Sequence, residues 1–365
     1  MNQGQVSAPI LEAKNISLAY GKQIVLDVPS LEVTPNKVLA IIGPNGSGKT
    51  TLLLCLSLLM KPATGNILYR GNIVPNGSSI MQMRRRFAVA FQEPLLLNTT
   101  VWDNITMGLR MRGVNREEIK DRARRWLERF GIAHLAQRSA RTLSGGEAQR
   151  TSLARAFALQ PEVLFLDEPF AALDVPTRQT LFGDIYNILQ ETKFTTVMVT
   201  HDRNEAQTLA HQIILLINGR IAQAGTPREI FSAPASEEIA KFVGMENILE
   251  GTIALNKDSI VDVSIKGQTI EGLSNCPAGG AVNVCIRPED ITLSIVKSRS
   301  SARNVFPGQI TSMLPVGPLV RVCLDCGFPL TALITRMSSD ELKLEIGKTV
   351  YASFKATAIH VITVK

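Results

Sequence analysis

An eight-residue stretch near the start of the chain reads Gly43-Pro44-Asn45-Gly46-Ser47-Gly48-Lys49-Thr50. It matches the pattern G-x-x-x-x-G-K-[ST] at every fixed position. Glycines let such a loop curl so that successive backbone N–H groups point at one anion. The lysine can then reach the β- and γ-phosphates of a nucleotide, and the threonine hydroxyl can hold Mg²⁺. The stretch therefore predicts a phosphate-binding loop.

The sequence on either side of the loop supports this interpretation. Residues 37–42 (KVLAII) predict a strand that enters the loop. Residues 51–60 (TLLLCLSLLM) predict a helix that leaves it and directs its N-terminal dipole at the same phosphate. A glycine-rich turn before a core helix is the alternative, but both elements lie where a phosphate loop needs them. We expect an α/β domain around a nucleotide site.

Length and composition limit the remaining possibilities. The chain has 365 residues, which predicts two or more domains. Its net charge of +7 suits nucleotides or an anionic membrane surface, although solvated surface charge accounts for most of such an excess. No apolar run reaches the roughly 18 residues of a membrane-spanning helix, and the first residues lack the layout of a signal peptide. We do not expect the chain to span a membrane.

The cysteines indicate a reducing compartment. Their odd number and irregular spacing do not form a disulfide framework; they are Cys55, Cys276, Cys285, Cys323 and Cys326. The last two form a lone C-x-x-C without a second pair or nearby histidines. A redox pair remains an alternative, but two ordinary cysteines of a strand are favoured.

Several polar residues follow predicted strands. Two strands, 10–20 and 24–33, precede the loop, and Tyr20 ends the first, where it can stack on an adenine ring or simply pack. Gln92 follows a predicted strand, 87–91, and its amide can ligate Mg²⁺ or place a water molecule. Residues 93–143 then change to a helical pattern rich in Arg and Met.

A second candidate anion site lies at Ser144-Gly145-Gly146-Glu147. Ser144 and Glu147 form a capping box, which predicts a helix start with two glycine N–H groups at its tip. A well-capped helix is the simpler interpretation. A helix tip without side chains also lets a phosphate approach, which would make it a second anion site.

Two acids and a histidine complete the candidate chemistry. The buried-type strand 163–167 ends in Asp167, followed by Glu168. Carboxylates at such a place are costly unless a cation is near, so Asp167 suits Mg²⁺ and Glu168 suits a water that attacks the γ-phosphate. His201 follows a further strand, 195–200, at the edge where ligands bind in open α/β sheets.

Taken together, these motifs resemble the ATP-binding subunit of ABC transporters over about the first 230 residues. The phosphate loop resembles Walker A, LSGGEAQR at 143–150 the signature motif, and VLFLDEP at 163–169 Walker B. Gln92 is similar to the Q-loop glutamine, Ala172-Leu173-Asp174 to the D-loop, His201 to the switch histidine, and Tyr20 to the adenine-stacking residue. The first D-loop position is Ala171, where the family usually has Ser.

The resemblance implies ATP hydrolysis in a head-to-tail homodimer. Each ATP would lie between Walker A of one chain, Gly43 to Thr50 with Thr51, and the helix tip of the other chain, Ser144, Gly145 and Gly146. Asp174 would belong to the same interface. Thr50, Gln92 and Asp167 would hold Mg²⁺. Lys49 would neutralise charge, Glu168 would orient the attacking water, and His201 would sense the γ-phosphate.

The C-terminal third has a different pattern. A helical, proline-punctuated linker at 225–244 leads to short alternating strands with glycine turns, which predict a small all-β OB-like barrel. Arg287-Pro288-Glu289-Asp290 resembles the TOBE domain of import-type ABC ATPases. We therefore expect an ATPase domain at 1–240, with a helical subdomain at about 93–155, and a β-barrel domain at 245–365.

The end of the chain resembles the molybdate-binding (mop) version of this barrel. The similar segments are 301–304, 307–310, 330–335, 350–356 and 358–362. Such barrels pair and can bind molybdate or tungstate, and Ser301, Arg303 and Lys355 offer suitable hydroxyl and cationic groups. The alternative is that Arg303 and Lys355 are ordinary surface charges.

The resemblance implies an ATPase that energises molybdate or tungstate import from the cytoplasmic face of the cell membrane. Its partners would be membrane permease subunits, a second copy of the chain and, indirectly, an external substrate-binding protein, with no nucleic acid. Sulfate, polyamine, sugar and ferric-ion importers are the nearest alternatives, because they share everything before the barrel. A non-transport ABC protein would need paired nucleotide domains or long insertions, and an oxyanion sensor would not need Glu168 and His201.

Overall fold

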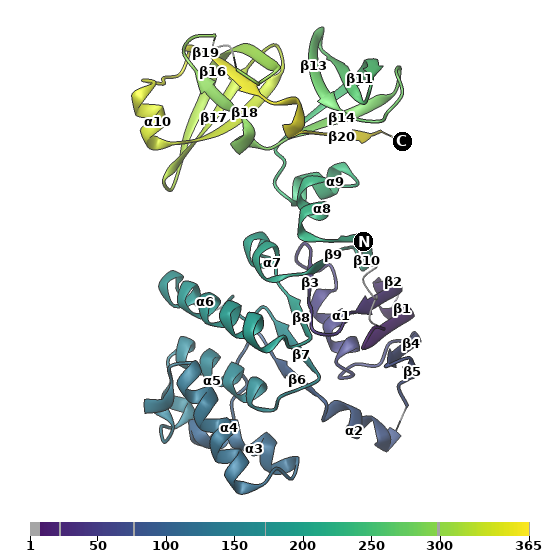
Figure 1. Cartoon of the computed structure of the whole chain (residues 1–365), viewed down its shortest axis with the longest axis vertical. Coiled ribbons are helices and arrows are strands. Elements are labelled where there is room, and N and C mark those ends of the chain that lie inside the picture. Colours follow the sequence, from purple (N-terminus) through teal and green to yellow (C-terminus); the bar gives the residue numbers. More distant parts are fainter. Residues whose placement is uncertain (1–7, 22, 76, 172, 298–299, 365) are drawn as a thin grey trace, which may run out of the picture. The chain divides into compact units, whose positions relative to one another are not determined.

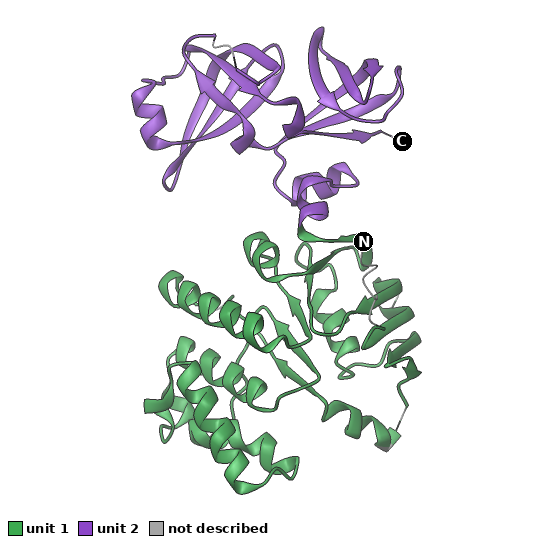
Figure 2. Cartoon of the chain, in the orientation of Figure 1, with its two compact units in different colours: residues 1–227 green, residues 228–365 purple. Residues whose placement is uncertain are grey.

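The computed structural model describes residues 8–21, 23–75, 77–171, 173–297 and 300–364. The chain divides into two compact units, residues 1–227 and residues 228–365 (Figure 2). The first unit combines two sheets with a group of helices, and the second is built mainly of strands (Figure 1). An α/β P-loop domain followed by an all-β domain was expected from the sequence, and both are confirmed.

The central sheet of the first unit has six strands in the order β10-β9-β3-β8-β7-β6. Their bounds are Arg220–Gly225 (β10), Gln212–Ile217 (β9), Val38–Ile42 (β3), Thr196–Val199 (β8), Val163–Asp167 (β7) and Phe87–Ala90 (β6). All neighbours from β9 to β6 are parallel, and β10 is an antiparallel edge strand. Every residue of β3, β7 and β8 is buried, as expected for strands covered on both faces.

A second, antiparallel sheet packs against the phosphate loop's helix. It has the order β2-β1-β4-β5, with bounds Gln23–Val33, Leu11–Tyr20, Thr64–Tyr69 and Asn72–Ile73. The predicted first two strands pair as a hairpin, and β4 with β5 forms a further antiparallel pair. Leu26, Leu52 and Phe165 belong to one buried core, so the hairpin, the loop's helix and the central sheet are fixed together.

The helix after the phosphate loop, α1, is shorter than the sequence predicted. It spans Lys49–Leu56, whereas the sequence predicted a helix that continues to Met60. Ser57 is its C-cap, and Leu58 adopts a positive φ of 64°, a left-handed conformation that a helix cannot contain. The apolar run continues past the helix because Leu58 is itself buried in the core.

The region between Gln92 and strand β7 is largely helical, as predicted. Its main helices are α3 (Val101–Met111), α4 (Arg116–Arg129) and α5 (Gly145–Ala158), which gather at one end of the first unit (Figure 1). Trp126, Phe130 and Phe157 pack together between them. The remaining helices of the unit are α2 (Ile80–Arg84), α6 (Val175–Thr192) and α7 (Arg203–Leu209).

The second unit begins with two short helices, α8 (Pro227–Ser232) and α9 (Glu237–Phe242), where a helical linker was predicted. The strands of its described residues form two five-stranded sheets, β13-β12-β11-β14-β20 and β15-β19-β16-β17-β18. The bounds are Asn247–Lys257 (β11), Ile260–Ile265 (β12), Gln268–Leu273 (β13), Ala281–Ile286 (β14), Thr292–Ser294 (β15), Asn304–Val316 (β16), Leu319–Asp325 (β17), Pro329–Thr335 (β18), Thr349–Phe354 (β19) and Ile359–Thr363 (β20). The inner faces of the two sheets share one apolar core that includes Val263, Val284, Val322 and Phe354.

The lone C-x-x-C lies at the end of β17. Cys323 is within the strand and Cys326 follows it, buried in the core of the second unit. Burial raises the pKa of the Cys326 thiol to about 11, which makes it a poor nucleophile. All five cysteines are free, and Cys326 packs in the apolar core of the second unit. Over the residues that the structure describes, no helix is long and apolar enough to cross a membrane.

Candidate functional site

The phosphate loop joins the carboxyl end of β3 to the start of α1, and it has space only for glycine at two of its positions. A Cβ atom at Gly43 would lie 2.1 Å from the carbonyl oxygen of Leu216. A Cβ atom at Gly48 would lie 2.7 Å from that of Val25, and Gly48 has a φ of 95°. These contacts hold the loop between β2 and β9, so its curled backbone is fixed by the surrounding sheets.

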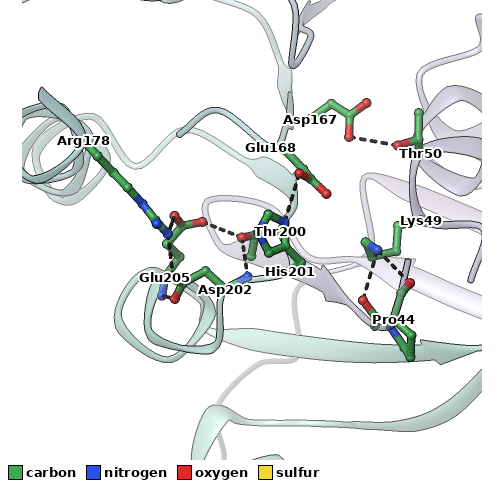
Figure 3. Close-up of polar contacts among 11 residues, drawn as sticks. Pro44, Lys49, Thr50, Asp167, Glu168, Arg178, Thr200, His201, Asp202 and Glu205 are labelled. Atoms are coloured by element: carbon green, nitrogen blue, oxygen red, sulfur yellow. Dashed lines mark hydrogen bonds and ion pairs between the residues drawn. The ribbon is translucent and has the colours of Figure 1, made fainter. Parts of the chain in front are cut away.

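Lys49 directs its ammonium group into this loop. Its Nζ donates hydrogen bonds to the carbonyl oxygens of Gly43 and Pro44, each at 3.0 Å (Figure 3). Burial lowers the pKa of Lys49, while the nearby carboxylates of Glu168 and Asp167 act in the opposite direction. The ammonium is therefore a buried charge at the position that a phosphate in the loop would contact.

The next residue, Thr50, meets the end of strand β7. Its Oγ1 donates a hydrogen bond to Oδ1 of Asp167 at 3.1 Å. Burial raises the pKa of Asp167, and the charge of Glu168 adds to this, whereas Thr50 and Lys49 favour the ionised form. Thr50 and Asp167, predicted as Mg²⁺ ligands, thus lie side by side as oxygen donors of the kind that Mg²⁺ prefers.

One loop atom indicates that the site is built for a polar ligand. The Oγ of Ser47 is buried and has no hydrogen-bond partner among the described residues. A buried hydroxyl without a partner is costly, and phosphate oxygens in the loop would supply one. Together with the Thr50–Asp167 pair, this donor set fits a magnesium nucleotide.

Glu168 and His201 come together at the carboxyl ends of β7 and β8. The Oε2 atom of Glu168 lies 3.0 Å from Nδ1 of His201. Glu168 has a φ of 44°, an uncommon left-handed conformation for this residue type, and its backbone N–H donates to the carbonyl oxygen of Val199 at 2.9 Å. Because the chain turns there, the carboxylate leaves the strand beside the phosphate loop (Figure 3).

Glu168 and His201 line one cavity of about 690 Å³ together with residues of the phosphate loop. The lining residues are Val25, Asn45, Gly46, Gly48, Lys49, Thr50, Thr51, Gln92, Glu168, Ala171 and His201. Gln92, Glu168 and His201 come from distant parts of the sequence, and they line the same cavity as the phosphate loop. Val25 was missed by sequence reasoning, because an apolar residue carries no chemical signature, whereas Ala171 was noted as the first D-loop position.

Tyr20 does not line this cavity. Its side chain is at the end of β1, 60% exposed, and its hydroxyl contacts the sulfur of Met60 at 3.9 Å. An exposed ring at the end of a strand is free to stack on a planar group, but the contact it makes in the structure is packing.

A second cavity, of about 500 Å³, lies where α5 and α6 begin. It is lined by Ser144, Gly145, Gly146, Glu147, Arg150, Leu173, Asp174, Pro176, Thr177 and Thr180. The predicted capping box is present, with the Ser144 side chain accepting from the Glu147 N–H and the Glu147 side chain accepting from the Ser144 N–H. Gly145 is exposed, and a Cβ atom there would meet nothing within 4 Å, so the start of α5 leaves space for an anion.

The neighbouring positions have structural roles in addition. A Cβ atom at Gly146 would lie 2.8 Å from Cγ2 of Thr177, so this glycine lets α5 approach α6. Asp174 caps α6 by accepting a hydrogen bond from the Thr177 N–H at 3.0 Å. Ala172, the first residue of the predicted D-loop triplet, lies outside the described residues.

The predicted oxyanion residues lie on the surface of the second unit. Asn304 pairs with Phe354, which puts Arg303 and Lys355 at adjoining positions beyond this pair. Both are exposed, as is Ser301. The Nε of Arg303 lies 3.7 Å from a carboxylate oxygen of Glu271, which weakens its attraction for an anion.

Comparisons with known proteins agree with this geometry. The family model described as ABC transporter matches residues 26–171, and the model of the TOBE domain matches residues 300–361. A molybdate/tungstate import ATP-binding protein of Pyrococcus horikoshii is 40% identical over 354 residues, covering 96% of this chain and 99% of the relative. The chain belongs to the ATP-binding subunits of ABC transporters.

Two further matches place this ABC subunit among its relatives. A sulfate/thiosulfate import ATP-binding protein of Shigella flexneri is 36% identical and covers 84% of the chain and 82% of the relative. A dimeric structure of the ATP-binding cassette MJ0796 in a post-hydrolysis state, bound to ADP and phosphate, is 28% identical with a TM-score of 0.54. It covers 60% of this chain and 99% of that one. The chain is therefore an ABC transporter ATPase with a C-terminal TOBE domain.

Proposed function

We propose that this ABC ATPase energises the import of molybdate or tungstate through a membrane permease. The observation that carries the proposal is the likeness to the Pyrococcus horikoshii importer subunit, which extends over 96% of the chain and so includes the C-terminal unit. The sulfate/thiosulfate relative is less similar and covers less of the chain, which makes sulfate the second candidate.

The arrangement of the first cavity supports hydrolysis by positioning and charge. Mg²⁺, held by Thr50 and Asp167 with Gln92 at the cavity wall, would neutralise charge on the phosphates when bound. Lys49 contributes a positive charge from within the loop. The Glu168 carboxylate, which contacts His201, would accept a proton from the attacking water, and His201 would contact the γ-phosphate.

The two cavities support a head-to-tail homodimer. One chain carries one phosphate loop and one separate helix tip with an exposed Gly145, and each would supply half of a site for a triphosphate. The dimeric cassette structures among the relatives agree with this assembly. In the dimer, Ser144, Gly145 and Gly146 of one chain would contact the γ-phosphate bound to the loop of the other.

The helical region offers a surface for the permease. Leu95, Leu97 and Met111 are exposed apolar residues near Gln92 and on α3. The Arg155 guanidinium donates to the carbonyl oxygens of Pro94 and Leu95 and so ties this segment to α5. A permease bound there, with the chain on the cytoplasmic face of the membrane, would sense dimer closure through Gln92. An external substrate-binding protein would act on the permease from the other side.

Transport measurements test the substrate. The chain, co-purified with its permease and reconstituted in proteoliposomes with the external binding protein, is expected to hydrolyse ATP several-fold faster with molybdate or tungstate than without. Stimulation by sulfate alone would assign the chain to sulfate import instead. The Lys49→Ala complex serves as the control, since it retains the permease but lacks the phosphate contact.

Calorimetric titration tests whether the TOBE domain itself binds the oxyanion. We expect saturable binding of molybdate and tungstate to the full chain, lost in Arg303→Ala because the cationic group on which the anion depends is removed. Arg336→Ala, which removes another exposed arginine of the same unit, is the matched control and is expected to bind normally. If the wild-type chain binds neither ion, the domain is structural and the oxyanion residues are wrongly assigned.

A further inference from the structure

A cluster of charged and hydroxyl groups lies directly behind His201 and has no place in the mechanism above. It consists of Arg178 on α6, Thr200 after β8, and Asp202 and Glu205 at the start of α7 (Figure 3). Two of these residues, Thr200 and Asp202, flank His201 in the chain.

The cluster is fully connected. The Nη2 of Arg178 donates to Oδ2 of Asp202 at 2.5 Å and to Oε1 of Glu205 at 2.6 Å. The Oγ1 of Thr200 donates to Oε2 of Glu205 at 2.5 Å and accepts from the Asp202 N–H at 3.0 Å. One guanidinium and one carboxylate thus hold both residues that flank the histidine.

Burial makes the charge of Glu205 costly unless these contacts are present. The Glu205 side chain is only 8% exposed, and burial raises the pKa of its carboxyl group while Thr200 and Arg178 favour the ionised form. A carboxylate in such a place is costly without a cation, so Arg178 is needed to keep it there. Asp202 in turn caps α7 by accepting from the N–H groups of Asn204 and Glu205.

His201 itself has few constraints of its own. Its side chain is 54% exposed, and the side-chain contact that the structure gives it is the one with Glu168. The direction of its ring therefore depends on the backbone of the turn that carries it, and the cluster fixes this turn on both sides. A ring displaced by about 1 Å would lose contact with the reacting phosphate at a large cost in rate.

Helix α6 connects this turn to the second cavity. Asp174, Pro176 and Thr177 line that cavity from the first turn of α6, and Arg178 is the next residue along the helix. The same helical turn thus contacts the second cavity at Thr177 and the His201 turn at Arg178.

We propose that Arg178 is a positioning residue, which fixes His201 in the ATP cavity through Asp202 and Glu205 and joins it to the helix that lines the second cavity. The inference depends on the proposed function in one respect, namely that His201 contacts the γ-phosphate during hydrolysis. In the proposed dimer the two cavities of one chain belong to two different ATP sites, so Arg178 connects them.

Steady-state ATP hydrolysis by the full chain tests this role. Arg178→Met is expected to lower kcat about tenfold while the KM for ATP changes less than about twofold, because the phosphate loop is untouched. In a chain that already carries His201→Ala, the same substitution is expected to cause no further loss, since its effect acts through the histidine. Arg129→Met is the matched control. Arg129, on α4, forms an ion pair with Glu191 near the C-terminal end of α6, whereas the second cavity lies at the start of α6.

A second variant separates positioning from folding. Arg178→Met leaves the Glu205 carboxylate without its cation and can destabilise the chain, so we pair it with Glu205→Gln, which keeps the hydrogen-bonding shape without the charge. This double variant is expected to melt near the wild-type temperature and still show the reduced kcat. Arg178→Lys is expected to regain part of kcat, because an ammonium group can hold one of the two carboxylates.

The possible failures are distinguishable. If His201→Ala hydrolyses ATP normally, the role of His201 in the proposed function is wrong, and the inference is overturned with it. If His201→Ala loses activity but Arg178→Met does not, only the inference is overturned. Additive losses in the double His201/Arg178 variant, or a wild-type kcat in the Arg178/Glu205 variant, would likewise show that Arg178 does not act by positioning the histidine.

Discussion

Glu168→Gln is expected to bind ATP normally but to hydrolyse it at least about a hundredfold more slowly, the usual contribution of a positioned general base. The glutamine amide has nearly the same shape as the carboxylate, so the contacts of the phosphate loop remain. It cannot accept a proton from the attacking water, and it no longer offers an anion to Nδ1 of His201, 3.0 Å away in the wild-type chain. In the proposed homodimer, ATP that is bound but not hydrolysed would hold the two chains together, so the variant is expected to accumulate as an ATP-bound dimer.

Single-turnover hydrolysis and gel filtration with ATP measure both effects. Glu162→Gln is a suitable control, because Glu162 lies just before the other end of β7, where it binds Arg86 and Tyr69. It removes one carboxylate at the opposite end of the same strand and is expected to leave the hydrolysis rate unchanged. Hydrolysis at a near-normal rate by Glu168→Gln would refute the proposed role of Glu168.

Lys49→Ala is expected to weaken ATP binding and abolish measurable hydrolysis. The substitution removes an ammonium group that donates into the loop, at the carbonyl oxygens of Gly43 and Pro44. It also leaves Asp167 and Glu168 without the cation that opposes their charge, so their repulsion for the phosphates increases. A loss of about 2 to 4 kcal/mol of transition-state stabilisation is the usual effect of removing such an electrostatic contact.

Calorimetric titration with ATP and steady-state hydrolysis check this expectation. Thermal denaturation checks that the variant remains folded, so that a loss of hydrolysis reflects the missing ammonium group. The control is Lys37→Ala, which removes an exposed lysine just before β3. Unaffected turnover in Lys49→Ala would overturn the assignment of the phosphate loop.

Much of the fold could be predicted because its decisive signals are local. The glycine pattern of residues 43–50 predicts a backbone shape, and the capping box of Ser144 with Glu147 predicts a helix start, whatever lies around them. Both are present in the structure. The predicted length of α1 was wrong, also for a local reason. The positive φ of Leu58 is incompatible with a helix, although the apolar pattern continues past it.

The second unit shows where local signals were insufficient. Alternating apolar residues predicted short strands there, and the structure contains them. The pairing of these strands into two sheets over one core depends on contacts between distant segments. The surroundings of Arg303 also depend on a contact between distant segments. Glu271, on strand β13, lies near Arg303, and no local sequence pattern predicts this contact.

The sequence by itself determined the identity of the phosphate loop, its helix, and the acids that follow strand β7, because each depends on residues within a few positions of one another. Only the tertiary structure decided that Glu168 meets His201, that Thr50 meets Asp167, and that Arg178 holds the turn behind the histidine. These contacts join residues that parallel strands and their helices bring to one edge of a sheet. Such neighbours are set by strand order and packing, which no short stretch of sequence specifies.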